Sequence, residues 1–193
     1  MNMSVLSRAD LVRELLAPAV CASNTLPLHI SDAVASVGMG KLADTELAHR
    51  LGVARELLLR DLREQMRNSP VMSSPQVLRD WLRLHCAGLQ HEVFLMLYLD
   101  AHHRLIEAEE LFRGTLTQTS VYPREVVKGA LTRNAAALAL AHNHPSGEAE
   151  PSRADELLTQ TLKSALSLVD VRVIDHFIVA GEKVVSFAEL GLL

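Results

Sequence analysis

Apolar residues in the first 70 positions recur at the three-to-four-residue spacing of helices, and residues that favour helix ends separate the periodic segments. Gly52 closes one such segment, and the next begins at Ala54. The predicted helices are one capped by Ser7 and ended by Pro18, a short one that begins near Ser31, one from Asp44 or Thr45 to Leu51, and one from Ala54 to about Asn68. We therefore expect a small all-α region at the N-terminus.

A short polar stretch that ends in proline interrupts this pattern. Asn68-Ser69-Pro70 is the predicted linker, and Ser74-Pro75 begins a further helix that runs to about Cys86. These signals divide the chain into a helical N-terminal domain over residues 1–70 and a second domain over residues 71–193.

The spacing of apolar residues changes from Glu92 onward. Val93 to Leu99 is an apolar run of strand length, and a turn at residues 100–103 leads into a second extended run near Arg104 to Ala108, which predicts a hairpin. The other predicted elements are a helix from Pro123 through Leu131, a buried strand from Ala136 to His142, an amphipathic helix capped by Ser152, and short strands at 171–174, 177–180 and 183–187. Mixed strands and helices with a hairpin at each end predict an α+β fold, a three-layer domain around a mixed β-sheet.

The composition is that of a folded protein. Hydrophobic residues make up 49% of the chain and charged residues 22%, which excludes the disordered and fibrous classes. A net charge of −4 argues against a protein that coats nucleic acid or an anionic membrane. Two cysteines, Cys21 and Cys86, fit a reducing compartment, and the longest apolar run, Ala135 to Ala141, is too short to span a bilayer. We expect a cytoplasmic protein with no membrane partner.

One segment combines residue types that bind metal ions. His142 and His144 are two positions apart at the end of a predicted strand, so their side chains share one face. Asp155 lies one turn into the helix capped by Ser152, where the helix dipole favours a carboxylate. Two imidazoles and one carboxylate leave the fourth position of a tetrahedral Zn²⁺ site open for water, as in catalytic sites. The sequence therefore predicts one catalytic Zn²⁺ per chain.

A catalytic metal site of this kind also needs a proton acceptor. Glu92, at the start of the first strand, is the candidate general acid/base, and the Ser152 hydroxyl is the candidate donor to an oxyanion while it caps its helix. Glu107, Glu109 and Glu110 on the next extended segment are competing candidates for the base.

His142-x-His144-Pro145, followed after six residues by Ser152-x-x-Asp155, resembles the metal motif of the JAMM (JAB/MPN+) metalloproteases. Four shorter segments resemble the bacterial RadC-like branch of that family: Tyr98-Leu99-Asp100, Pro123-Arg124-Glu125, Asp175-His176 and Ser186-Phe187. The resemblance covers about residues 71–193 and implies zinc-dependent hydrolysis of peptide or isopeptide bonds in a peptide or protein substrate. It also implies the site roles: zinc ligands His142, His144 and Asp155, general acid/base Glu92, and stabilising hydroxyl Ser152.

Plainer interpretations stand beside these roles. The histidine pair can be loop residues bonded to the backbone, and Asp155 can be a capping acid, which is compatible with ligation. The other histidines of the C-terminal domain are interpreted as surface or supporting residues, His176 with a structural role; they are His85, His91, His102, His103 and His176.

DNA binding by the N-terminal region is the alternative function. In the RadC-like family this region usually ends in a Gly-Ile-Gly helix-hairpin-helix turn that contacts phosphate; the corresponding residues here are Gly52-Val53-Ala54, which lack the third glycine. Residues 45–53 followed by a helix also match a helix-turn-helix, but acidic residues interrupt the basic face. Residues 1–70 hold eight basic and eight acidic residues, and this zero net charge weakens the case for DNA binding. The second hypothesis is therefore a DNA-associated or scaffolding module whose metal site is not used for proteolysis. The oligomeric state is left open.

Overall fold

The structure is a computed structural model that describes residues 3–17, 32–114 and 121–193, and the side chains of residues 32–44 are outside that description. Two compact units divide the chain, Met1–Asp61 and Leu62–Leu193. The sequence predicts a domain boundary at residue 70. That boundary refers to which segment folds independently, which the division into compact units does not test, so it stays a prediction. In the described part of the chain, no helix has both the length and the apolar character that a bilayer crossing requires.

The first unit holds a short 3₁₀ turn, η1 (Met3–Val5), the helix α1 (Arg8–Leu16) and most of α2 (Asp32–Asn68). The predicted cap of α1 is confirmed, because the Ser7 hydroxyl accepts a hydrogen bond from the Asp10 N–H at 3.1 Å. The predicted stop at Pro18 and the residue Cys21 lie outside the described residues. A helix does begin next to Ser31, but it is not short.

The predicted break at Gly52 is wrong, because α2 is continuous through this residue. Glycine weakens a helix by about 1 kcal/mol relative to alanine but does not end it when the neighbouring turns are satisfied. Here those turns carry ion pairs between residues four apart, Glu46 with Arg50 and Glu56 with Arg60. Residues 45–54 thus lie in one continuous helix instead of the turn that either DNA-binding motif would place there.

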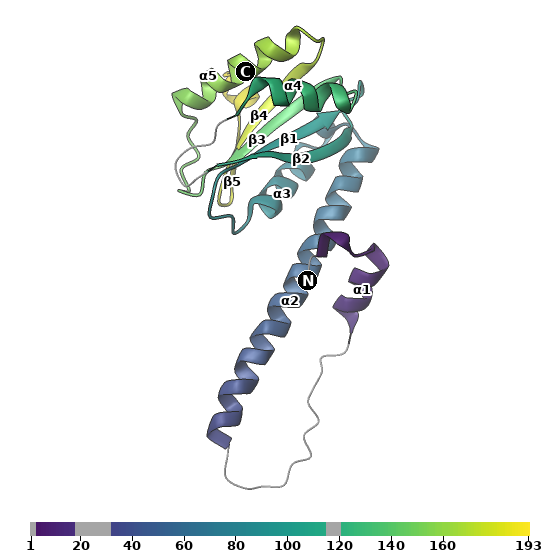
Figure 1. The fold of residues 1–193 in the computed structure, drawn as a ribbon, viewed down its shortest axis with the longest axis vertical. Helices are drawn as coiled ribbons and strands as arrows, with labels where there is room; N and C mark the ends of the chain where they lie inside the picture. The colour runs from purple at the N-terminus through teal and green to yellow at the C-terminus, as the bar shows by residue number, and fades with distance from the viewer. Residues whose placement is uncertain (1–2, 18–31, 115–120) are drawn as a thin grey trace. The chain divides into compact units, whose positions relative to one another are not determined.

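The second unit is built around a five-stranded sheet with the strand order β2-β1-β3-β4-β5 (Figure 1). Its strands are β1 (Val93–Leu99), β2 (Leu105–Arg113), β3 (Ala137–Asn143), β4 (Arg172–Ala180) and β5 (Lys183–Ser186). Its helices are the 3₁₀ turn η2 (Val71–Ser73), α3 (Pro75–Cys86), α4 (Pro123–Thr132), α5 (Arg153–Ser167) and α6 (Phe187–Leu190). Only β3 and β4 pair in parallel, so the sheet is mixed, as predicted.

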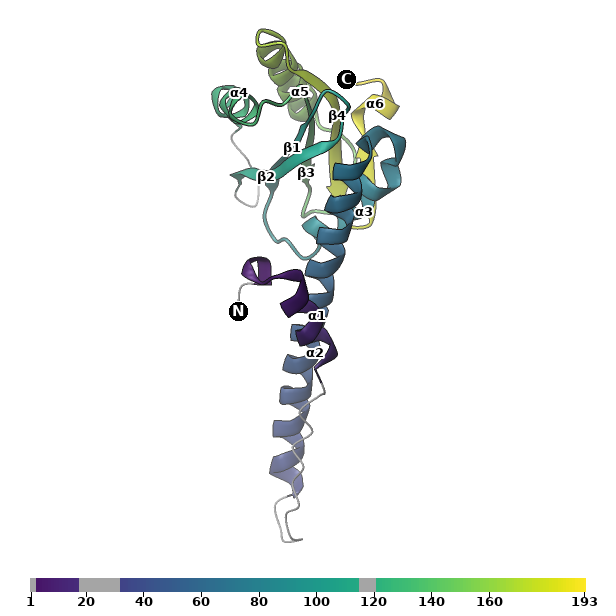
Figure 2. The ribbon, with the colours of Figure 1, turned by 90° about the vertical axis from the view of Figure 1, so that its right-hand side faces the viewer.

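Helices cover both faces of this sheet, which gives the predicted three layers. Figure 2 shows α4 and α5 on one face and α3 on the other. The α4/α5 layer packs on a buried cluster that includes Phe94, Tyr98 and Leu140 from the strands and Leu162 and Leu166 from α5. Both faces of β1 and β3 are buried, which explains why these strands are continuous apolar runs in the sequence.

Most boundaries in this unit agree with the sequence prediction, and two differ. The second strand of the first hairpin continues to Arg113 instead of ending near Ala108. The predicted separate strands at 171–174 and 177–180 are one strand, β4, whose register against β3 shifts by one residue: Leu138 pairs with Val173, but Ala139 pairs with Asp175. This irregularity adds one residue to β4, so that Val173 and His176 meet partners on the same face of the sheet.

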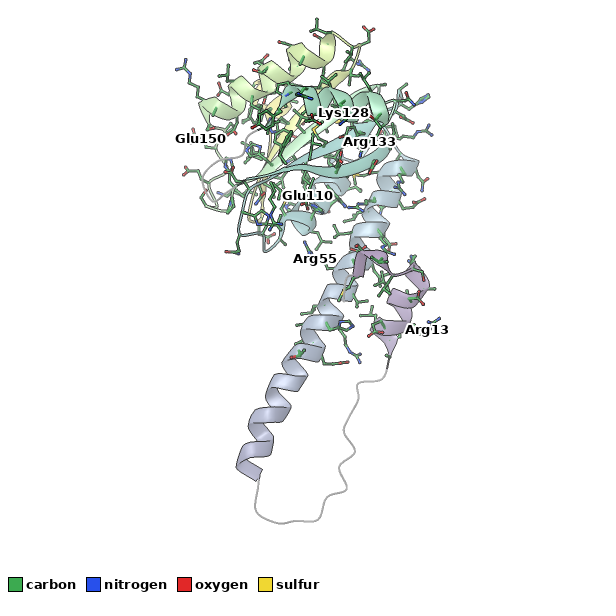
Figure 3. All side chains as sticks on the ribbon, viewed as in Figure 1. Arg13, Arg55, Glu110, Lys128, Arg133 and Glu150 are labelled. Atoms are coloured by element: carbon green, nitrogen blue, oxygen red, sulfur yellow. The ribbon has the colours of Figure 1, made fainter. Side chains whose placement is uncertain are left out.

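Three polar side chains, Tyr98, Glu109 and Arg133, contact one another at the first hairpin. The Tyr98 hydroxyl donates to Glu109 at 2.7 Å, and the Arg133 guanidinium lies 4.3 Å from the Tyr98 ring centre. Arg133 also pairs with Glu107 and Glu109. It directly follows the last residue of α4, and Figure 3 labels it together with Lys128 of that helix. Burial, then the hydrogen bond to Glu109, raises the pKa of Tyr98 well above its ordinary value of 10.0.

Candidate metal centre

The end of β3 and the first turn of α5 bring the three predicted ligands together. The Nε2 atoms of His142 and His144 are 2.9 Å apart. Asp155 lies 3.2 Å from His142 Nε2 through Oδ1 and 3.8 Å from His144 Nε2 through Oδ2. One ligand atom from each of the three residues falls within 4.8 Å of the others.

These separations fit a metal ion. Donors about 2.0–2.2 Å from a tetrahedral Zn²⁺ are separated from one another by about 3.3 Å, which is within the range observed here. Nitrogen, nitrogen and carboxylate oxygen are also a donor set that zinc accepts. The three residues present therefore suit the ion that the sequence predicts, and the assignment of Zn²⁺ stays a prediction.

His144 is oriented by the loop that follows β3. Its backbone N–H donates to the Val179 carbonyl at 2.8 Å, which continues the pairing with β4 by one residue. Its Nδ1 lies 2.7 Å from the Glu148 carbonyl, so Nδ1–H donates there and Nε2 keeps its lone pair for the centre. The loop returns through Gly147, whose φ of +83° favours glycine.

Asp155 is held by the capping box that begins α5. The Ser152 hydroxyl and backbone N–H both donate to Asp155 Oδ2, at 2.6 and 2.8 Å, and the Asp155 N–H donates back to Ser152 Oγ at 3.2 Å. Burial by itself raises the pKa of Asp155, but the neighbouring His142 ring and the two bonds from Ser152 outweigh it. The pKa is consequently far below 3.8, so Asp155 is an anion at neutral pH.

His142 is supported from inside the protein by a second histidine. His176 Nε2 lies 2.9 Å from His142 Nδ1, and His176 Nδ1 lies 2.7 Å from the Thr159 hydroxyl. The His176 ring is fully buried; it stacks on the Phe187 ring at a centroid distance of 4.8 Å and makes an edge contact with the Phe94 ring at 5.6 Å. Burial is the main cause that lowers the pKa of His176 well below 6.5, which keeps the ring neutral.

The predicted base Glu92 lies at the start of β1, where its backbone is clamped on both sides. The Asn143 side chain accepts from the Val93 N–H at 2.8 Å and donates to the His91 carbonyl at 3.1 Å. Asn143 is buried, and it lies in the chain between the two predicted ligand histidines. The segment that carries Glu92 is thus attached to the strand end that carries the predicted metal ligands.

A cavity of about 720 Å³ connects these groups. Its walls include all five predicted site residues: Glu92, His142, His144, Ser152 and Asp155. Phe94, Val121 and Leu158 add apolar surface, and Glu148 and Glu150 add charge in the loop that leads into α5, where Figure 3 labels Glu150.

The competing candidates for the base belong to other contacts. Glu107 and Glu109 pair with Arg133, and Glu110 lies 2.9 Å from His85. None of these three side chains lines the cavity, which leaves Glu92 as the glutamate at the β1 end of the site.

Sequence reasoning gave His176 a structural role without naming its contact, and it missed two supporting residues, Thr159 and Asn143. The Asp175-His176 pair was a visible signal, since two adjacent polar residues interrupt an apolar strand. Asp175 faces away from the centre and accepts bonds from the His176 N–H, the Ala188 N–H and the Ser186 hydroxyl. Thr159 and Asn143 carried no signal in the sequence.

The mixed five-stranded sheet between helical layers, with a His-His-Asp group at the end of β3, defines a JAB/MPN-type domain. The family model of the RadC-like JAB domain matches residues 72–192. The chain therefore belongs to the RadC-like JAB domain family, as the sequence motif indicated.

Relatives extend this similarity over most of the chain. The UPF0758 protein of Leptothrix cholodnii is 63% identical over 156 residues, which are 81% of this chain and 68% of the relative. The UPF0758 proteins of Aromatoleum aromaticum and Nitrosomonas europaea are 56% and 50% identical over 97% of this chain and 82% of each relative. These matches include the helical N-terminal region, and the relatives' names state no activity.

Proposed function

We propose that this chain is a zinc-dependent hydrolase of peptide or isopeptide bonds that acts on a peptide or protein substrate. The observation that carries the proposal is the convergence of His142, His144 and Asp155 on one point in the wall of an open cavity. Two imidazoles and one carboxylate leave a coordination position for a reactant, which distinguishes a catalytic site from a closed structural one. Zn²⁺ bound there supplies Lewis acidity, which polarises a carbonyl and acidifies water.

Glu92 supplies the proton transfer in this proposal. Its carboxylate removes the proton of the attacking water, and the same group then donates that proton to the leaving nitrogen as the C–N bond breaks. Its position in the cavity wall and the clamp from Asn143 support this role. A carboxylate on a fixed strand end loses little conformational freedom when it accepts the proton.

Ser152 supplies a hydroxyl donor to the oxyanion. Its Oγ accepts the Asp155 N–H, so the oxygen stays in place while the O–H is free to rotate from Asp155 Oδ2 toward a substrate oxygen. A donor positioned in this way stabilises charge that develops only during the reaction.

The test combines metal analysis with turnover. Elemental analysis of protein purified without chelator should find about one zinc per chain in the wild type and a large loss in Asp155→Ala. Glu92→Gln should keep its zinc and lose hydrolysis of a peptide or isopeptide substrate found by screening. Normal turnover in Glu92→Gln would place the base elsewhere, and a folded wild type without metal would overturn the proposal.

A further inference from the structure

We propose that His176 and Thr159 are positioning residues that fix the tautomer and orientation of His142, so that its Nε2 faces the centre as a lone pair. The inference rests on the proposed metal site and adds two residues to it. We call the hydrogen-bonded side chains His142, His176 and Thr159 the buried row.

The buried row is continuous from the cavity wall to helix α5. His142 Nδ1 and His176 Nε2 are 2.9 Å apart, and His176 Nδ1 and Thr159 Oγ1 are 2.7 Å apart. Thr159 Oγ1 in turn donates to the backbone carbonyl of Asp155 at 2.7 Å. The row thus begins at one predicted ligand and ends on the main chain of another.

Proton counting allows two directions along this row. In the first, the Thr159 hydroxyl donates to the Asp155 carbonyl, His176 Nδ1–H donates to Thr159, and His142 Nδ1–H donates to His176 Nε2. His142 Nε2 is then unprotonated and can bind a metal ion. In the second direction the Thr159 hydroxyl gives up the Asp155 carbonyl and donates to His176 Nδ1, and His176 Nε2–H donates to His142 Nδ1. His142 then carries its proton on Nε2 and cannot bind a metal ion through that atom.

The structure favours the first direction at its far end. The Thr159 hydroxyl has a single proton, and the Asp155 carbonyl four residues earlier is placed to accept it. Once that proton is used, Thr159 Oγ1 can only accept from His176 Nδ1–H, and the remaining donors follow in order. The hydroxyl of one helix residue therefore sets the tautomer of a histidine two side chains away.

Packing limits the row to these three groups. Thr159 and His176 are both fully buried; the Phe187 ring stacks on the His176 ring, and the Phe94 ring makes an edge contact with it. The register shift in β4 before Asp175 turns His176 toward the face on which its neighbour Leu140 and the α4/α5 layer lie. Without that extra residue, the same sequence would direct His176 to the opposite face.

His144 reaches the same result by a different contact, the bond from its Nδ1–H to the Glu148 carbonyl in the loop. A backbone carbonyl can only accept, so it fixes the tautomer of His144 by itself. A neutral imidazole can accept or donate, and His142 consequently depends on Thr159 for its orientation. Second partners of this kind commonly change metal affinity by about 10- to 100-fold.

The experiment measures Zn²⁺ affinity of the full-length chain by competition with a fluorescent chelator. Thr159→Val replaces the hydroxyl with a methyl group and should weaken Zn²⁺ binding by about tenfold or more. Thr161→Val is the matched control: Thr161 makes the same bond to the carbonyl four residues earlier, but on the exposed side of α5, and its loss should leave the affinity unchanged. Thr159→Ser should restore the wild-type affinity.

A second measurement keeps the proposal testable if Thr159→Val does not fold. Long-range ¹H–¹⁵N spectra of the zinc-loaded wild type should show His176 with its proton on Nδ1. A proton on Nε2 would overturn the proposal, as would a folded Thr159→Val with the affinity of Thr161→Val. A wild type that binds no Zn²⁺ overturns the proposed function and the buried row with it, whereas tight wild-type binding with an unaffected Thr159→Val overturns the buried row alone.

Discussion

Three consecutive residues at the end of β3 divide the work of the site between the two faces of the sheet. His142 and His144 face the cavity, and Asn143 between them bonds to the backbone on both sides of Glu92. Because side chains alternate along a strand, the two histidines can serve as predicted metal ligands while the asparagine between them supports the predicted base. It follows that the two functions can be separated by mutation.

Asn143→Ala is expected to reduce turnover without removing the metal. The change leaves the Val93 N–H and the His91 carbonyl without their buried partner, which costs about 2–4 kcal/mol of unfolding free energy. Glu92 loses its fixed backbone, so kcat for the proposed hydrolysis should fall while zinc content stays at the wild-type value. Chemical denaturation, metal analysis and kinetics on one preparation check the three parts. A zinc loss equal to that of Asp155→Ala would mean that Asn143 supports the ligands instead.

Elements with a local signal were predicted closely. The helices expected at Pro75, at Pro123 and after the Ser152 cap begin at the expected residues, because cap and first-turn preferences depend only on neighbouring residues. The predicted cap by Ser74 is wrong, because its side chain makes no cap hydrogen bond. Gly52 and the two halves of β4 were predicted wrongly, because a glycine in a supported helix and an extra residue in a paired strand depend on contacts from outside the segment. The proximity of the three predicted ligands followed from spacing. The contact of His176 with His142 needs the parallel pairing of β3 and β4, which spacing does not specify.

Gly52 in α2 and Gly129 in α4 should respond to alanine in opposite ways. A Cβ at Gly129 would overlap the Tyr98 hydroxyl, which Glu109 holds in place, so Gly129→Ala should lower the unfolding free energy by about 1–3 kcal/mol. A Cβ at Gly52 meets only the flexible end of the Met3 side chain at 3.1 Å. Gly52→Ala should therefore add up to about 1 kcal/mol through helix propensity. Urea unfolding of both variants checks the signs, and a destabilised Gly52→Ala would show that glycine is required there.

The turn between β1 and β2 should give stability that depends on pH. The Asp100 carboxylate accepts from the backbone N–H groups of Arg104 and His102 and from the Arg104 side chain. The backbone bond from Arg104, with smaller contributions from the other two, lowers the pKa of Asp100 below 3.8. Because the pKa of Asp100 is lower in the folded state, its charge stabilises the protein at pH values above the pKa of the unfolded state. This stabilisation is lost as the pH falls below about 3.8.

Comparison of wild type with Asp100→Asn isolates this effect. The asparagine keeps an oxygen acceptor for the turn but has no charge to lose. The difference in unfolding free energy should be constant near neutral pH and should shrink below about pH 3.8, as measured by urea unfolding at a series of pH values. A difference that does not change between pH 6 and pH 3 would show that the charge of Asp100 does not contribute.

At the scale of the whole chain, the site belongs entirely to the second unit, and the open question is where that unit begins. The sequence places the boundary at residue 70, whereas the compact unit begins at Leu62, inside α2. The last turns of α2 make contacts within this unit: the Arg63 guanidinium lies 5.3 Å from the Trp81 ring centre, and Met66 is almost fully buried. These contacts predict that the end of α2 is part of the folding unit.

The fragments 62–193 and 71–193 should therefore differ in stability. Loss of the Arg63 contact with Trp81 and of the buried Met66 side chain removes about 2–4 kcal/mol, which lowers the Tm of a domain of this size by about 10 °C. Both fragments keep every residue of the candidate metal centre. Calorimetry in the presence of a chelator removes any contribution of bound metal, so it compares the Tm of the two protein folds alone. A variant of the longer fragment with Arg63→Ala and Met66→Ala should lose most of the difference, because it keeps the helix but not the contacts. Equal Tm values for the two fragments would instead place the boundary at residue 70 and make the end of α2 dispensable for folding of the JAB domain.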